Sequence, residues 1–211
     1  MRAYERFLQY VTVHTTSDPN TGTHPSTQRQ FDLARKLVEE LKALGLSDAH
    51  VDEHCYVYAT LPATPGQETA KALGFIAHMD TTDDASGENV KPQLHPNYDG
   101  GPVTLPATGA VLDPAVFPFL KEMKGQTLIT ADGSTLLGAD DKAGVAEIMT
   151  MVERIQAEGR PHGKLCIGFT PDEEIGEGAS LFDVAHFGAD FAYTVDGDDV
   201  GEISYENFNA A

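Results

Sequence analysis

Histidine and acidic residues stand directly after four apolar runs of the sequence. The groups are His78 with Asp80 after GFIA, Asp140 with Asp141 after TLLGA, Glu173 with Glu174 after IGFTPD, and Asp196 after FAYTV. If these runs are parallel strands, their carboxyl ends meet at one edge of a sheet, where ligands bind in open α/β folds. Imidazole nitrogens and carboxylate oxygens are ligands of divalent metals. The pattern therefore predicts a metal site at that edge.

His78 and Asp80 are two residues apart, and residues at this spacing in a strand point to the same side. His78 can bind a metal through one ring nitrogen while Asp80 accepts the proton of the other nitrogen and fixes the tautomer. The alternative is a buried histidine that is hydrogen-bonded to its neighbour. The other acidic groups favour the metal site.

Asp140 and Asp141 precede a predicted helix, whose first turn favours carboxylates. We expect Asp141 to cap this helix. Asp140 is then available to bridge two cations, because a carboxylate has two oxygens.

Glu173 and Glu174 are adjacent and cannot point in one direction, so one is expected to bind metal while the other transfers a proton. A glutamate beside a metal-bound water is suited to act as a general base. The alternative is two solvated acids in a turn. Asp196 is predicted to be a single terminal ligand, with Asp198 and Asp199 as solvated loop acids.

Apolar periodicity predicts an α/β fold with a mainly parallel, mixed sheet flanked by helices. A first helix follows Pro25 and Ser26 and ends near Gly45. Strands are predicted at 57–61, 72–80, 164–170 and 191–197, and further helices at about 142–158 and 179–187. The strand at 72–80 is almost continuously apolar and is expected to be buried and central.

Two segments between these elements have weaker signals. Residues 81–124 are rich in Pro, Gly, Asp and Asn, have no sustained period and are predicted to be a long functional loop. The segment from Gln126 is predicted to be a hairpin arm that ends in a turn at Asp132 and Gly133.

Composition excludes several classes of protein. The 211 residues include 33 acidic and 14 basic side chains, and the net charge of −19 excludes a nucleic-acid binder that relies on phosphate contacts. No apolar run approaches the roughly 18 to 20 residues of a membrane span, and a secretory signal is not recognisable, so we expect a cytoplasmic protein. Cys55 and Cys166 are predicted to be buried free thiols.

Several motifs resemble the M20 family of di-zinc metallopeptidases and, within it, the tripeptide aminopeptidases. The matching segments are GFIAHMDTT, GQTLITADGSTLLGADDKAGVAEIMT, FTPDEEIGEGA, AYTVDG and YENFNAA. They occur in this order along the whole chain. The resemblance implies a zinc-aminopeptidase-like catalytic domain that hydrolyses the first peptide bond of short peptides, by means of a metal-activated water.

The resemblance also implies a role for each site residue. One zinc would be bound by His78, Asp140 and Asp196, and the other by Asp140 and Glu174. Asp80 would orient His78, and Glu173 would be the general base. A cis peptide bond would join Asp140 to Asp141.

By the same resemblance, residues 1–211 form the N-terminal portion of a catalytic domain, without a lid domain, the returning part of the catalytic domain or the histidine that completes the second zinc site. We therefore expect one well-bound and one weak metal, little activity of the chain alone, and possible self-association through an incomplete sheet. The alternatives are another M20-type hydrolase, such as a dipeptidase or an N-acyl-amino-acid deacylase, and a non-catalytic metal-binding half that needs a complementary chain.

Overall fold

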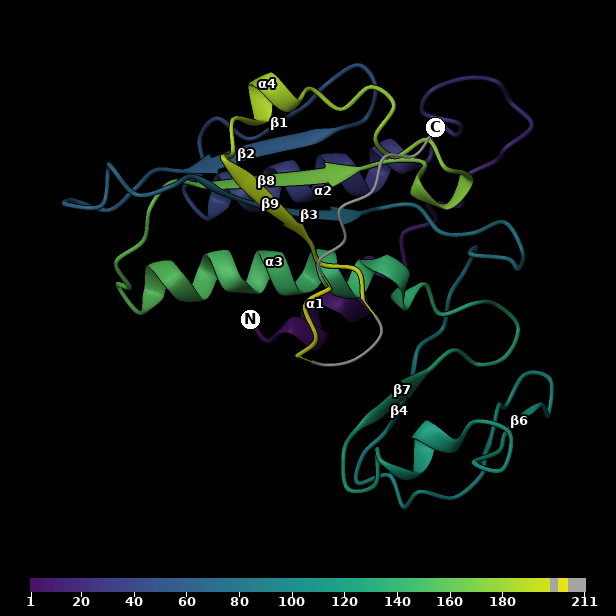
Figure 1. The fold of residues 1–211 in the computed structure, drawn as a ribbon. Helices are drawn as coiled ribbons and strands as arrows, with labels where there is room; N and C mark the ends of the chain where they lie inside the picture. Colours follow the sequence, from purple (N-terminus) through teal and green to yellow (C-terminus); the bar gives the residue numbers. More distant parts are fainter. Residues whose placement is uncertain (198–200, 205–211) are drawn as a thin grey trace.

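A mixed five-stranded sheet forms the centre of the fold (Figure 1). The computed structural model describes residues 1–197 and 201–204, so Asp198, Asp199 and the whole YENFNAA motif lie outside the described residues. The strand order is β1 (His50–Val51), β2 (Val57–Leu61), β8 (Leu165–Thr170), β3 (Leu73–His78) and β9 (Phe191–Thr194). Strands β8, β3 and β9 are parallel, whereas β1 and β2 are antiparallel to their neighbours. The predicted α/β fold is confirmed.

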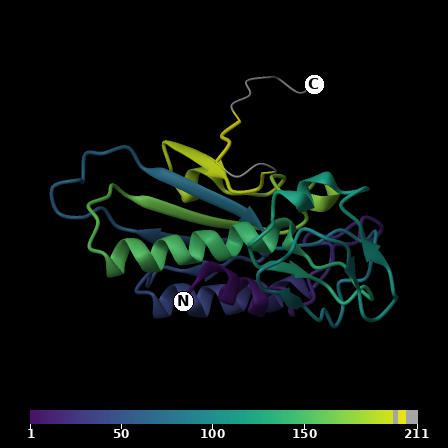
Figure 2. The same cartoon turned by 90° about the horizontal axis from the view of Figure 1, so that it is seen from below.

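The two faces of the sheet are covered unequally (Figures 1 and 2). The helices are α1 (Ala3–Tyr10), α2 (Gln30–Ala43), α3 (Ala139–Ala157) and α4 (Val184–Phe187). Helix α1 packs on α3, α3 packs on β3, and α2 packs on β1 and β2, so these three helices enclose the main apolar core. The opposite face has a smaller cluster around Tyr56, Tyr58 and Phe187.

The most buried strand is β8, which lies in the middle of the sheet and is buried at every position. The prediction for 72–80 is partly wrong, because β3 is internal but its residues Leu73, Phe75 and Ile76 are only partly buried. Helix α4 has four residues instead of the nine predicted at 179–187, and it covers too little of the sheet to bury β3 and β9.

The predicted long loop at 81–124 contains regular structure of its own. Its elements are β4 (Gln93–His95), β5 (Val103–Thr104), β6 (Val111–Leu112) and the 3-10 helix η1 (Pro118–Lys121). Tyr98, Val103 and Leu120 form a small separate core. This part lies beside the main sheet in Figure 1. Because its strands are two or three residues long, they have no detectable alternation in the sequence.

Strand β7 (Leu128–Thr130) pairs with β4 in an antiparallel arrangement. The predicted local hairpin is therefore wrong. In a local hairpin the partner strand would follow the turn at Asp132 and Gly133, whereas β4 comes before β7 in the chain and is separated from it by β5, β6 and η1. The turn itself is present: Gly133 has a φ of +96°, and the Ser134 N–H donates to Asp132 Oδ1 over 2.8 Å.

Two further sequence predictions concern the cysteines and the membrane. Cys55 and Cys166 are buried and free, as predicted. None of the helices in the described part of the chain combines the length and apolar character that a bilayer crossing requires.

Candidate metal centre

The polar residues that follow the strands converge at one edge of the sheet. His78 ends β3, Asp196 follows β9, and Glu173 and Glu174 begin the 3-10 helix η2 (Glu173–Ile175) directly after β8. Asp140 comes from the first turn of α3, and the apolar run TLLGA before it is not a strand, so the strand predicted there is wrong. Because β3, β8 and β9 are parallel, their carboxyl ends lie side by side, and this accounts for the convergence.

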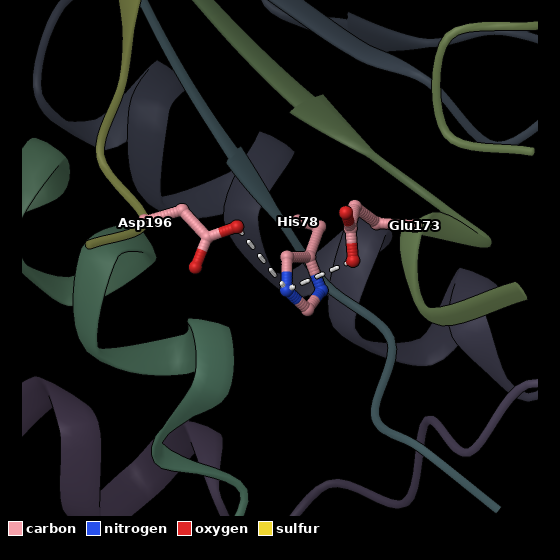
Figure 3. A group of neighbouring side chains, drawn as sticks. All are labelled: His78, Glu173 and Asp196. Atoms are coloured by element: carbon pink, nitrogen blue, oxygen red, sulfur yellow. Dashed lines mark ion pairs between the residues drawn. The ribbon is translucent and has the colours of Figure 1, made fainter. Parts of the chain in front are cut away.

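The imidazole of His78 is the centre of this cluster. Its Nε2 lies 2.9 Å from Asp140 Oδ1, 3.7 Å from Glu173 Oε2 and 3.8 Å from Asp196 Oδ2. Glu173 and Asp196 approach the ring from opposite sides (Figure 3). A single nitrogen thus faces three carboxylates.

Ligand atoms of two groups lie within 4.8 Å of one another: His78 with Glu173 and Asp196, and His78 with Asp140 and Glu174. All five predicted residues are therefore close enough to share a pocket. The grouping differs from the set His78, Asp140 and Asp196 that the family resemblance implies for one zinc. Both groups share the imidazole of His78, and Asp140 is the nearest of these acids to its Nε2.

Asp80 fixes the ring of His78. The Nδ1 atom of His78 lies 3.2 Å from the backbone oxygen of Asp80 and 3.3 Å from Asp80 Oδ1, so Nε2 is directed towards the acids. The Asp80 carboxylate is fully buried and accepts hydrogen bonds from the Glu173 and Glu174 N–H groups over 3.0 and 3.2 Å. This second task, holding the backbone of the glutamates, has no signal in the sequence.

The aspartates at the start of α3 point in different directions. Asp141 is buried; its Oδ1 accepts from Gly144 N–H over 3.1 Å and its Oδ2 from His78 N–H over 3.2 Å. The predicted helix cap is confirmed, and it also ties α3 to β3. The Asp140 side chain is 70% exposed and faces the imidazole. The peptide bond between Asp140 and Asp141 is cis, as the resemblance implies.

Burial alone would lower the pKa of His78, but the surrounding carboxylates dominate. The hydrogen bond and charge of Asp80, with the charges of Asp141 and Asp140, raise the pKa of His78 to about 10. In the metal-free chain the negative carboxylates therefore favour the protonated, positively charged form of the imidazole.

The pKa values of three acids in and beside the cluster are raised, as burial and neighbouring negative charges predict. Burial raises the pKa of Asp141 to about 8, against the opposing charge of His78. Burial also raises the pKa of Glu173 and of Glu174, and the negative charges of neighbouring carboxylates raise both pKa values further. This excess of negative charge suits a divalent cation, which would satisfy several carboxylates at once.

Two buried charged residues near the site were not identified from the sequence. Lys142 is 2% exposed and donates to the Val13 carbonyl over 2.8 Å, and burial lowers its pKa to about 8. Asp172 is fully buried and directly precedes Glu173. Its position after an apolar strand was a usable signal, because Asp196 was selected on the same grounds.

No protein-family model matches the chain. Among curated proteins, peptidase T of Alkaliphilus oremlandii is 57% identical over 210 residues, which are 98% of this chain and 51% of the relative. The chain is a homologue of peptidase T. It spans about half the length of the curated peptidase T relatives that it matches.

Solved structures agree with this relationship. A tripeptidase from Staphylococcus aureus is 27% identical, with a TM-score of 0.65 over 94% of this chain and 43% of that one. An M20 family metallo-carboxypeptidase from Sulfolobus solfataricus is 16% identical and has the same fold, with a TM-score of 0.56 over 92% of this chain and 37% of that one. The resemblance to M20 peptidases of the peptidase T type is confirmed. The imidazole and carboxylate donors of the site suit a divalent metal.

Proposed function

We propose that this chain provides the metal centre of an aminopeptidase that removes the N-terminal residue from tripeptides. The observation that carries the proposal is the ring of carboxylates around His78 Nε2, at the ligand-binding edge of a sheet found in metallopeptidases. Sequence identity to peptidase T supports the substrate class, since the matching segments include the site residues.

The proposed metal is zinc, with two ions in a complete subunit. His78, Asp140 and Asp196 would hold one ion, and Asp140 and Glu174 would hold the other. Imidazole nitrogen and carboxylate oxygen are common zinc ligands, and the donor atoms of both groups are close enough to serve one or two ions.

When bound, the metal would supply a Lewis acid that lowers the pKa of a water molecule towards about 7 and polarises the peptide carbonyl. Glu173 would accept a proton from the attacking water and return it to the leaving amine. The raised pKa of Glu173, caused by burial, suits an acid that must both take and give a proton. Asp80 keeps His78 in the orientation that presents Nε2.

We further propose that residues 1–211 form the N-terminal portion of a catalytic domain, and that the lid domain and the rest of the catalytic domain belong to a complementary segment. From this chain the second ion receives only Asp140 and Glu174. One tight and one weak zinc site are therefore expected in a calorimetric titration. Two equally tight sites would contradict this assignment.

The catalytic proposal is tested by complementation with the second half of a peptidase T relative. We expect little hydrolysis by the chain alone, and zinc-dependent cleavage of trialanine by the mixture that is lost on Glu173→Gln. Cleavage of dipeptides or N-acetyl amino acids instead would identify another M20-type hydrolase. A mixture that assembles and binds zinc without hydrolysing any of these substrates would identify a non-catalytic metal-binding half.

Strand β9 supports a proposal of self-association. It is the edge strand of the sheet and is exposed along its length, including Phe191 at 49% and Tyr193 at 42%. Exposed edges with apolar side chains pair with other chains. Sedimentation should show dimers or larger species that Tyr193→Lys disperses, and a wild-type chain that stays monomeric would contradict the proposal.

We also propose a cytoplasmic location. Cys55 and Cys166 are buried and free, which is usual for proteins of a reducing compartment. Fractionation of the producing cells tests this, and recovery outside the cytoplasm would contradict it.

A further inference from the structure

Asp172 is a fully buried carboxylate that directly precedes the two glutamates of the metal centre. It accepts hydrogen bonds from Ser26 N–H over 2.6 Å, from Ser26 Oγ over 2.5 Å and from Gln30 Nε2 over 2.6 Å. In the described part of the chain its only ion-pair partner is His24, whose Nδ1 lies 3.6 Å away. Three donors, two from Ser26 just before α2 and one from Gln30 at its first position, thus hold one carboxylate.

The backbone of Asp172 has a left-handed conformation, with a φ of +57° and a ψ of +26°. This conformation reverses the chain at the end of β8 and starts η2. The Asp172 N–H donates to Gln30 Oε1 over 3.2 Å, so Gln30 contacts both the side chain and the backbone of Asp172. Aspartate and asparagine tolerate this region better than most residues with a side chain.

The next two residues are held from the opposite side. Asp80 accepts from the N–H groups of Glu173 and Glu174. Two buried carboxylates therefore fix three consecutive residues. Asp80 also contacts His78, whereas none of the contacts described for Asp172 includes His78.

We propose that Asp172 is a positioning residue that, through Ser26 and Gln30, sets the direction in which Glu173 and Glu174 meet the metal. This inference rests on the proposed metal binding by Glu174. An uncharged asparagine fits the same space and backbone conformation, but it offers one acceptor oxygen where three donors converge. The carboxylate is needed because Oδ1 accepts from the Ser26 hydroxyl and Gln30 while Oδ2 accepts from the Ser26 N–H, and in asparagine one of these positions would hold an NH2 group, which cannot accept.

The test uses cobalt(II) as the probe, because its visible spectrum reports the geometry of its ligands. Cobalt affinity and spectrum are measured for the wild-type chain, Asp172→Asn, and the double variant Asp172→Asn/Gln30→Glu. In the double variant the amide donates to the new carboxylate, which restores the hydrogen bond with its polarity reversed. Asp183→Asn is the matched control, since Asp183 caps α4 by accepting from His186 N–H outside the metal centre.

Asp172→Asn should weaken cobalt binding by about 10-fold or more and change the spectrum, as expected when a residue that orients ligands is lost. The double variant should restore both readouts to near the wild-type values, and Asp183→Asn should change neither. A merely structural role of Asp172 would lower the melting temperature without altering the spectrum of the bound cobalt.

An Asp172→Asn chain with wild-type affinity and spectrum would overturn the inference, as would a folded double variant that restores neither. If Asp172→Asn does not fold, Ser26→Ala decides, because it removes one donor and keeps the carboxylate; an unchanged spectrum there would also overturn the inference. A wild-type chain that binds no cobalt would instead remove the proposed function, and this inference with it.

Discussion

Two clusters of charged side chains, each built around one buried residue, have opposite compositions. On the helical side, Arg6 is 3% exposed and lies 2.5 Å from Glu40 Oε1 and 2.8 Å from Glu153 Oε2. Its guanidinium also donates to Thr150 Oγ1, and the Tyr10 hydroxyl donates to the second oxygen of Glu40. Every carboxylate there has a donor, and the cluster joins α1, α2 and α3.

At the edge of the sheet, the carboxylates of Asp140, Glu173 and Asp196 converge on one ring nitrogen of His78. The imidazole cannot donate to all of them. The comparison teaches that burial of charge alone does not mark a functional site. The number of acidic groups relative to basic ones around the buried residue separates a site that can bind a cation from a cluster that holds helices together.

The largest expected effect is on metal binding. His78→Ala removes the one nitrogen that all the acids share, so zinc affinity should fall by more than about 100-fold, beyond the range found for residues that only support ligands. Calorimetric titration measures it. Arg6→Met serves as the control from the other cluster and should keep the wild-type zinc affinity.

Arg6→Met should in turn have the larger effect on folding. Without the guanidinium, Glu40 and Glu153 lose their shared partner, and the free energy of unfolding should fall by about 3–5 kcal/mol. Urea unfolding of the metal-free chain measures the change. A loss below about 1 kcal/mol would show that this cluster does not hold the helices together as described.

The two clusters should respond to pH with opposite signs. The pKa of His78 is raised to about 10 from an ordinary value near 6.5, so its contribution to stability is full below about pH 6.5 and is lost as the pH rises through about 10. The terminal ammonium of Met1 and the Arg6 guanidinium lower the pKa of Glu153, so that contribution is lost as the pH falls below about 4.

Urea unfolding of the metal-free chain between about pH 6.5 and 9 separates these effects. The free energy of unfolding should decline by at most about 1.4 kcal/mol per pH unit from His78, and saturating zinc should remove the decline. In His78→Asn the slope should be smaller. An equal slope in the variant would assign the pH dependence to other groups.

The smallest expected effect concerns an exposed ion pair on α3. Arg154 and Glu158 are 3.0 Å apart but 65% and 36% exposed. Solvent screening makes such pairs weak, so Arg154→Met should change the free energy of unfolding by less than about 0.5 kcal/mol. A larger loss would mean that exposure does not distinguish this pair from the Arg6 cluster.

The sequence predicts those parts of the molecule whose signal is local. An apolar run followed by acids is visible before Asp80, Asp140 and Glu173. The parallel order of β3 and β8 brings the first and last of these groups together, whereas Asp140 is positioned by the start of α3. The cap by Asp141 is likewise encoded by its position before a helix.

The remaining features depend on partners far away in the chain. Asp172 meets Ser26, Arg6 meets Glu153, and β7 pairs with β4, and no spacing within one segment indicates any of these contacts. The shortness of α4 was equally unpredictable, since the apolar residues predicted as one helix at 179–187 begin in a turn that precedes α4. Tertiary packing therefore decides the supports of the site, while local pattern decides its ligands.

Anomalous diffraction at the zinc edge from crystals of the zinc-loaded chain tests the central claim most directly. We predict a peak about 2.0–2.1 Å from His78 Nε2 and about 2.0–2.2 Å from oxygens of Asp140 and Asp196. A zinc-loaded crystal with no peak beside His78, or with its zinc bound elsewhere on the acidic surface, would contradict the account.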